Sequence, residues 1–129
     1  MQKVFSVLLI CSSVVFAEVK LSSSYSKCMD KSGGVTALGL DCMNIETEIQ
    51  DKKLNKFYKS AMKMLEPKKQ AELKDVQRFW IKHRDAQCGF YIGLTGGTMD
   101  NTNSSSCFLT MTAERAQELE SIAGMLYLF

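Results

Sequence analysis

From Cys42 onward, apolar residues recur at steps of three and four, and charged residues fill the positions between them. The apolar positions are Ile45, Ile49, Leu54, Phe57, Tyr58, Ala61, Met62 and Leu65. Lysines and one aspartate take the opposite side, at Asp51, Lys52, Lys53, Lys56 and Lys59. This spacing is typical of an amphipathic helix. Pro67 ends or interrupts the helix and suits the first turn of the next one.

Two further helices follow from the same pattern. One is predicted from Pro67 to about Gln87, with apolar positions at Ala71, Leu73, Val76, Phe79, Trp80 and Ile81. The last should begin at Thr112, which resembles an N-cap and is followed by Glu114 in the first turn. Its apolar positions are Ala116, Leu119, Ile122, Ala123 and Leu126. We expect the final residues, up to Phe129, to pack on the core as the end of this helix.

Two segments lack such a pattern. The segment 22–39 contains serines, glycines and the first cysteine of the domain, and it predicts a loop or a short broken helix. Between Cys88 and Thr112 the residues are typical of turns and loops: Gly89, Gly93, Gly96, Gly97, Asp100, Asn101 and Ser104 to Ser106. Long loops inside small domains are usually functional or disordered.

The first 17 residues resemble a cleavable signal peptide. Lys3 precedes an apolar run that is too short to span a bilayer, and the run ends at Ala17 before a charged residue. A retained anchor, or a lipoprotein modified at Cys11, is the alternative; Ile10 before that cysteine fits a lipoprotein poorly. We therefore predict a signal peptide at 1–17 and a single helical domain at 18–129, exported to the periplasm or secreted.

Four cysteines remain after the leader: Cys28, Cys42, Cys88 and Cys107. An even number in a small exported domain points to two disulfides, for which three pairings are possible. Chain order favours pairing of neighbours, Cys28 with Cys42 and Cys88 with Cys107. A zinc site is the rival interpretation, but the chain has no Cys-x-x-Cys pair. The predicted fold is all-α: a small bundle of three main helices with two disulfides, one of which staples a long loop.

The composition gives little support for catalysis or nucleic-acid binding. The formal charge of +2 falls to +1 when Lys3 is removed with the leader, which is too low for a nucleic-acid footprint. His83 is the only histidine. Paired carboxylates could cleave a glycosidic bond, but 14 acidic residues supply some pair by chance. We therefore assign no catalytic residue, no metal ligand and no cofactor.

Trp80, Arg84 and Cys88 lie at successive four-residue steps and share a helix face. The guanidinium of Arg84 can stack on the indole or bind a carboxylate, for which Asp51 and Asp85 are the candidates. One interpretation is a patch that faces a ligand. We favour the other, a structural clasp between helices made by Asp51, Trp80, Arg84 and Asp85.

The predicted loop contains apolar residues that a small bundle can hardly bury, and loops held on rigid scaffolds often carry binding. The candidate partner-binding residues are Tyr91, Ile92, Leu94, Gly96, Gly97 and Met99. The alternative, that these side chains fold back over the core, stays open from the sequence.

The sequence resembles the LprI-type lysozyme-inhibitor domain family over nearly the whole segment 18–129. The resemblance rests on Asp-x-x-Leu-Asn-x-x-Tyr from Asp51, on Gln-x-x-Trp-x-x-x-Arg-Asp-x-x-Cys from Gln77, and on further matching positions at Cys28, Cys42, Leu73, Gly96, Gly97, Cys107, Thr112 and Arg115. It implies a small bacterial envelope protein, mostly helical, with two disulfides and inhibition of lysozyme as its activity. It brings no set of inhibitory residues, and the matching positions are interpreted as scaffold.

These observations favour an exported cell-envelope binding protein with a protein partner, which the resemblance suggests is lysozyme. The alternative is an accessory or structural envelope module that binds another protein or peptidoglycan. A cell-wall glycan hydrolase is the least favoured hypothesis. We expect no nucleic-acid partner and no stable membrane insertion once the leader is cleaved.

Overall fold

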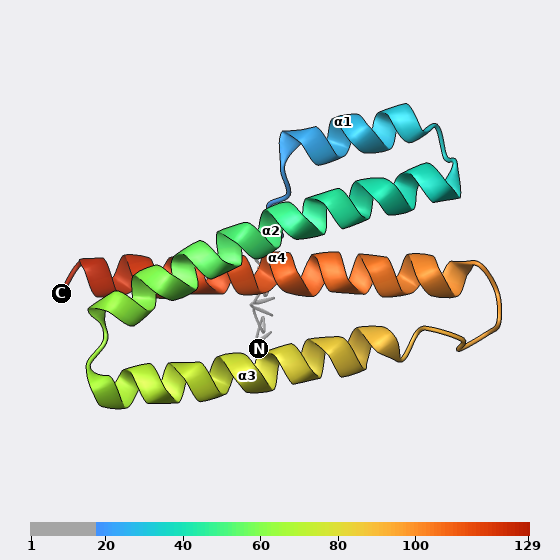
Figure 1. Ribbon diagram of the computed structural model, residues 1–129. Coiled ribbons are helices and arrows are strands. Elements are labelled where there is room, and N and C mark those ends of the chain that lie inside the picture. The colour runs from blue at the N-terminus through green and yellow to red at the C-terminus, as the bar shows by residue number, and fades with distance from the viewer. Residues whose placement is uncertain (1–17) are drawn as a thin grey trace, which may run out of the picture.

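The computed structural model describes residues 18–129, so the predicted signal peptide lies outside the described residues. This part of the chain forms four helices (Figure 1). Their bounds are α1 (Ser23–Ser32), α2 (Thr36–Met64), α3 (Pro67–Gly89) and α4 (Met99–Tyr127). The prediction of an all-α fold with two disulfides is confirmed, whereas the prediction of three main helices is wrong by one helix.

Helix α4 lies between α2 and α3 (Figure 1). Helices α2 and α4 run side by side in the same direction, α3 runs back along the other side of α4, and α1 folds back along α2. The centre of the core is formed by Leu54, Ala116 and Leu119. Around it pack the partly buried Phe57, Tyr58, Leu73, Trp80 and Ile122. The core therefore sits where α2, α3 and α4 meet.

Helix α1 occupies part of the segment 22–39, for which a loop or a short broken helix was expected, and it is a helix of 10 residues. Ser22 caps it, because its Oγ accepts a hydrogen bond from the backbone N–H of Tyr25. Gly33 ends the helix with a φ of 56°, in the left-handed region that glycine adopts without strain. Helix α2 then begins at Thr36, six residues before the predicted start at Cys42.

The buried face of α2 differs from the apolar stripe read from the sequence. Ile45 and Ile49, expected in the core, are 57% and 38% exposed. The buried positions one residue later hold Glu46 and Gln50. These polar side chains bind the segment that precedes α1: the Glu46 carboxylate accepts hydrogen bonds from the N–H and Oγ of Ser22 and from Gln50 Nε2. These hydrogen bonds satisfy the Glu46 carboxylate and the Gln50 Nε2 amide, and they offset the cost of burying them.

Helix α4 begins at Met99, whereas the sequence predicted a loop as far as Thr112. Thr112 is fully buried in the middle of the helix and is not its N-cap. In the first part of α4 the polar residues Asp100 and Ser104 are buried. In the absence of tertiary contacts, serine and asparagine favour turns over helices. Packing alongside α2 overrides that preference.

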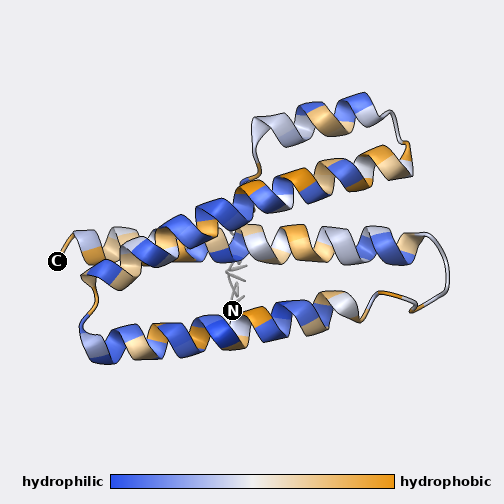
Figure 2. Ribbon diagram, viewed as in Figure 1, coloured by the Kyte–Doolittle hydropathy of each residue, from blue (hydrophilic) through white to orange (hydrophobic). Residues whose placement is uncertain are grey.

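Helix α3 agrees with its prediction, with Pro67 in the first turn and an end at Gly89 rather than Gln87. Its apolar residues are nevertheless divided between two sides. Leu73 and Trp80 pack on the core, whereas Val76 and Phe79 are 51% and 70% exposed. Figure 2 shows the resulting alternation of hydrophobic and hydrophilic positions along α3.

The C-terminal tail does not cover the core as expected. Tyr127 and Leu128 are 84% and 80% exposed, and Phe129 is fully exposed. The last turn of α4 therefore leaves apolar side chains in solvent beside the end of α2.

Candidate functional site

The two disulfides join neighbouring cysteines, as chain order predicted. Cys28–Cys42 connects α1 to the start of α2, and Cys88–Cys107 connects the end of α3 to α4. Cys88 is fully buried. Because Cys107 lies two turns inside α4, the second disulfide ties together two helices and the segment between them.

The connecting loop between α3 and α4 spans residues 90–98, so it is less than half as long as the loop that was predicted between Cys88 and Thr112. Asp100, in the first turn of α4, organises it. Its carboxylate accepts hydrogen bonds from the Oγ1 of Thr95 at 2.7 Å, the N–H of Thr95 at 2.9 Å and the N–H of Gly96 at 2.9 Å. These bonds, led by that of the Thr95 side chain, lower the pKa of Asp100. The loop is therefore fixed at both ends, by a disulfide and by a charged hydrogen-bond acceptor.

The connecting loop presents apolar side chains to solvent. Ile92 and Leu94 are 57% and 50% exposed, and Phe90 before them is 65% exposed. Tyr91 is half-buried beside the Cys88–Cys107 disulfide. Met99 is the first residue of α4 and is 59% exposed. Tyr91 is partly covered, and the other side chains of this group do not fold back over the core.

The two glycines of the loop have different roles. Gly96 has a φ of 76°, a backbone conformation that residues with a Cβ rarely adopt, and its N–H binds Asp100. The N–H of Gly97 donates to Thr95 Oγ1, and its carbonyl accepts from the N–H of Asp100. Gly96 and Gly97 therefore shape the turn rather than provide a contact surface.

The predicted clasp brings Trp80, Arg84 and Asp85 together. The guanidinium carbon of Arg84 lies 5.0 Å from the centroid of the Trp80 ring, and its Nη2 lies 2.9 Å from Asp85 Oδ1. On α4, the same guanidinium lies 5.5 Å from the Phe108 ring and donates to Thr112 Oγ1 at 3.4 Å. This cluster joins α3 to α4 close to the second disulfide.

Asp51 is not part of that cluster. It is exposed on α2, where its carboxylate accepts a hydrogen bond from Asn55. The acid that binds Arg84 is Asp85, its neighbour on the same helix.

The structure adds a buried polar contact that helical periodicity did not reveal. Arg115 on α4 is only 5% exposed, and its Nε donates to Gln77 Oε1 on α3 at 2.9 Å. Nη1 of Arg115 pairs with Glu118 at 2.6 Å. The only sequence signal for such a contact is a charged residue on the apolar side of a helix. Arg115 is such a residue, because it lies four residues before Leu119 and seven before Ile122.

His83 is exposed on α3. In the range 18–129, no three histidine, cysteine, aspartate or glutamate side chains gather as a metal site. No helix in this range is long and apolar enough to cross a membrane. The features that stand out are the disulfide-bound connecting loop and the cation–aromatic cluster that supports it.

The chain was compared with known families, curated proteins and solved structures. The family model described as "Lysozyme inhibitor LprI" matches residues 28–119. No curated protein and no solved structure matched the chain. The matched segment runs from the first disulfide cysteine into the last third of α4, so it includes both disulfides, the connecting loop and the Trp80–Arg84 stack. Because this match covers well over half of its length, the chain belongs to the LprI lysozyme-inhibitor family.

Proposed function

We propose that this protein is an exported inhibitor that binds lysozyme through the connecting loop 90–98 and acts by steric occlusion of the substrate groove. No covalent step is involved. The support comes from membership of the LprI family together with the exposed apolar residues of a loop that is held at both ends.

The exposed residues of the connecting loop carry this proposal. Ile92 and Leu94 project from a short loop whose ends are fixed by Cys88–Cys107 and by Asp100. A loop backbone that is already held in place loses little conformational entropy on binding, so more of the apolar burial contributes to affinity. Apolar anchors surrounded by polar residues are the usual source of binding energy in protein interfaces. The loop therefore has the properties of a preorganised binding element.

The net charge of the protein contributes little to binding through the loop. A segment with a side-chain charge of +1 generates a weak long-range field, so electrostatic steering contributes little to association. Affinity should then depend on buried apolar area, and it should change little between low and high salt. This expectation distinguishes loop insertion from binding through a charged patch.

Lysozyme activity measured with a molar excess of the oxidised protein tests the proposal. We expect inhibition by the wild type and its loss in the double variant Ile92→Asp/Leu94→Asp, because two apolar side chains that lysozyme would bury become charged. The matched control is Val76→Asp on α3. Val76 has an exposed fraction similar to those of Ile92 and Leu94, and it lies outside the loop. Unchanged activity of several lysozyme types in the presence of the wild type would refute inhibition, and equal inhibition by the double variant would exclude this loop.

Export is part of the same proposal. Two disulfides suit an oxidising compartment, and the first 17 residues have the composition of a cleaved leader. Mass spectrometry of protein purified from the producing cell should find a chain that begins at Glu18 and has no free thiol. A chain that keeps its first residues, or four free thiols, would contradict export.

An accessory module that binds another envelope component is a second candidate. It is favoured by exposed apolar residues outside the loop, at Val76 and Phe79 on α3. Purification from envelope extract with the wild type as bait should enrich one component, and Val76→Asp/Phe79→Asp should lose it while keeping any inhibition of lysozyme. Co-sedimentation of the wild type and of Val76→Asp/Phe79→Asp with peptidoglycan tests whether the bound component is peptidoglycan.

A further inference from the structure

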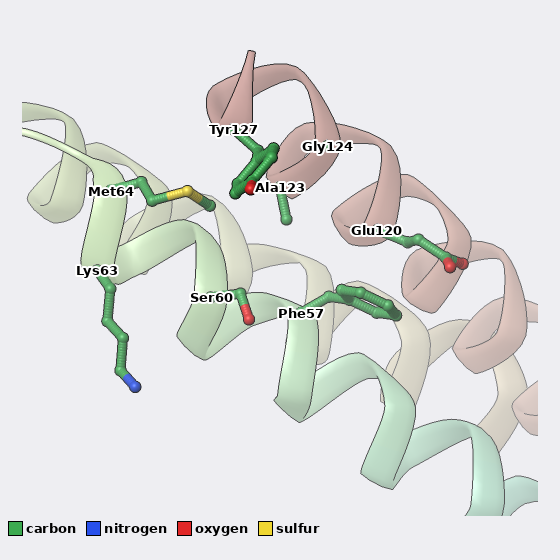
Figure 3. A pocket seen from close by; sticks show the side chains of 8 residues that line it. All are labelled: Phe57, Ser60, Lys63, Met64, Glu120, Ala123, Gly124 and Tyr127. Atoms are coloured by element: carbon green, nitrogen blue, oxygen red, sulfur yellow. The ribbon is translucent and has the colours of Figure 1, made fainter. Parts of the chain in front are cut away.

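A shallow cavity of about 500 Å³, wide open to solvent, lies between the C-terminal parts of α2 and α4 (Figure 3). It lies at the opposite end of α4 from the connecting loop. Helix α2 and helix α4 contribute four lining residues each: Phe57, Ser60, Lys63, Met64, Glu120, Ala123, Gly124 and Tyr127. Its size falls within the usual range of small-molecule sites, about 300–1,000 Å³.

The walls of this cavity are mainly apolar. In Figure 3 the side chain of Ala123 points from α4 toward α2, and those of Phe57, Met64 and Tyr127 lie around it. Gly124 contributes no side chain to the lining, and a Cβ at this position would meet nothing within 4 Å, so a larger residue has room there. Met64 and Tyr127 are 40% and 84% exposed, so apolar surface at the mouth is left in contact with water. Covering that surface with an apolar ligand is favourable.

The charges around the cavity are mostly positive. Its one carboxylate, that of Glu120, pairs with Lys53 at 2.7 Å. A row of exposed lysines follows the adjacent side of α2 at steps of four, three and four residues: Lys52, Lys56, Lys59 and Lys63. Within the range 18–129 none of these four ammonium groups lies within 4.0 Å of a carboxylate. Lys63 is one of the lining residues, and in Figure 3 its side chain extends away from the space between Met64, Tyr127 and Phe57. A turn of its flexible stem would bring the ammonium to the mouth.

An apolar cavity beside a row of cations suits a molecule with an apolar body and one anionic end. We propose that this cavity binds a single-chain anionic amphiphile, with the acyl chain between α2 and α4 and the head group at Lys63. A hydrocarbon chain buries its surface against Phe57, Ala123 and Gly124 without needing a hydrogen-bond partner. The head group stays at the mouth, where it keeps most of its hydration and gains attraction from the lysine row.

The cavity is distinct from the proposed inhibitory loop. Its α4 side, Glu120 to Tyr127, lies beyond the segment 28–119 matched by the family model. The proposal therefore stands independently of lysozyme binding. Each can fail without the other, because the cavity variants below leave the loop unchanged.

Filling the cavity is the first test. The probe is dodecanoate below its micelle-forming concentration, measured by displacement of a fluorescent polyene fatty acid from the oxidised protein. Gly124→Leu places a side chain in the cavity, and it should weaken binding by about tenfold or more. The matched control is Gly89→Leu, at another helical glycine whose Cβ would also meet nothing within 4 Å. Equal affinity of Gly124→Leu and wild type would overturn the proposal.

Charge at the mouth is the second test. Lys63→Glu should weaken dodecanoate binding by about three- to tenfold at low salt, and high salt should reduce this difference. Lys82→Glu, on α3, makes the same change in net charge away from the cavity and should have little effect. Uncharged dodecanol should bind the wild type more weakly than dodecanoate, and its affinity should be the same for Lys63→Glu. Equal binding of dodecanol and dodecanoate to the wild type would overturn the role of the anionic head group.

Two further measurements identify the source of the ligand and exclude a membrane. A free fatty acid and an acidic lysophospholipid share the proposed chemistry, and competition between dodecanoate and monomeric lysophosphatidylglycerol shows which head group binds more tightly. Sedimentation with phosphatidylglycerol vesicles should bring down little protein. Vesicle binding that Gly124→Leu leaves unchanged, together with no binding of either monomer, would assign the lysine row to a lipid surface and refute the cavity site.

Discussion

The guanidinium of Arg84 on α3 lies over the indole of Trp80, with 5.0 Å between the guanidinium carbon and the ring centroid. The same cation lies 5.5 Å from the Phe108 ring on α4. An arginine between two aromatic rings gains both cation–π attraction and apolar contact along its stem. Asp85 orients the guanidinium from the outer side. This stack fixes the separation of α3 and α4 next to the disulfide that holds the connecting loop.

Trp80→Ala should destabilise the protein by about 3 kcal/mol, at the lower end of the range for large aromatic residues because Trp80 is half-buried. The control is Phe79→Ala, which removes a neighbouring ring that is 70% exposed and should cost under about 1 kcal/mol. Urea denaturation followed by circular dichroism measures both. Similar losses for the two variants would contradict the packing of Trp80 on the core.

Gln77→Leu should cost about 1–3 kcal/mol, since Nε of the buried Arg115 loses its acceptor. By contrast, Glu118→Gln removes the charge from a partner that is 60% exposed, and it should cost under about 1 kcal/mol. Denaturation of the two variants at neutral pH measures the difference. A larger loss for Glu118→Gln would show that Arg115 depends on its ion pair rather than on Gln77.

Each disulfide should contribute about 3 kcal/mol, because the two close segments of similar length, with separations of 14 and 19 residues. We expect Cys28→Ser/Cys42→Ser and Cys88→Ser/Cys107→Ser to lower stability to a similar extent. Only the second pair should make the connecting loop sensitive to proteolysis. Limited digestion with mass spectrometry locates the cuts, and equal cutting of the loop in both variants would show that Cys88–Cys107 does not hold it.

The connecting loop should lose order in acid. The pKa of Asp100 is lowered in the folded protein, so the stability that its charge provides is present above the ordinary aspartate pKa. It is lost as the pH falls through the lower, folded pKa, below about pH 4. Amide signals of Thr95 and Gly96 in NMR spectra should therefore stay constant from neutral pH down to that region and then shift.

Asp100→Asn is the control for this titration. The amide cannot change charge, so the same signals should differ from those of the wild type at neutral pH. They should show little further change as the pH falls. A wild-type loop whose amide signals change between pH 5 and pH 7 would exclude Asp100 as the group that holds it.

The sequence by itself predicted the helical class, α3 and, from chain order, the pairing of neighbouring cysteines; it left open whether the apolar side chains of the connecting loop are exposed. The prediction of α3 succeeded because the signals for it are local: Pro67 marks its first turn, and Gly89, where loop chemistry starts, marks its end. The cysteine pairing followed from chain order because each disulfide joins elements that are consecutive in the chain. The contact of Trp80 with Arg84 followed from four-residue spacing on one helix.

Only the tertiary structure decided where α4 begins and which face of α2 is buried. The serines and asparagines before Thr112 favour turns in isolation, and contact with α2 makes them helical. Glu46 and Gln50 are buried in place of Ile45 and Ile49 because the segment before α1 supplies hydrogen bonds from 24 to 30 residues away. Periodicity reports local preference, whereas burial depends on partners that are distant in the chain.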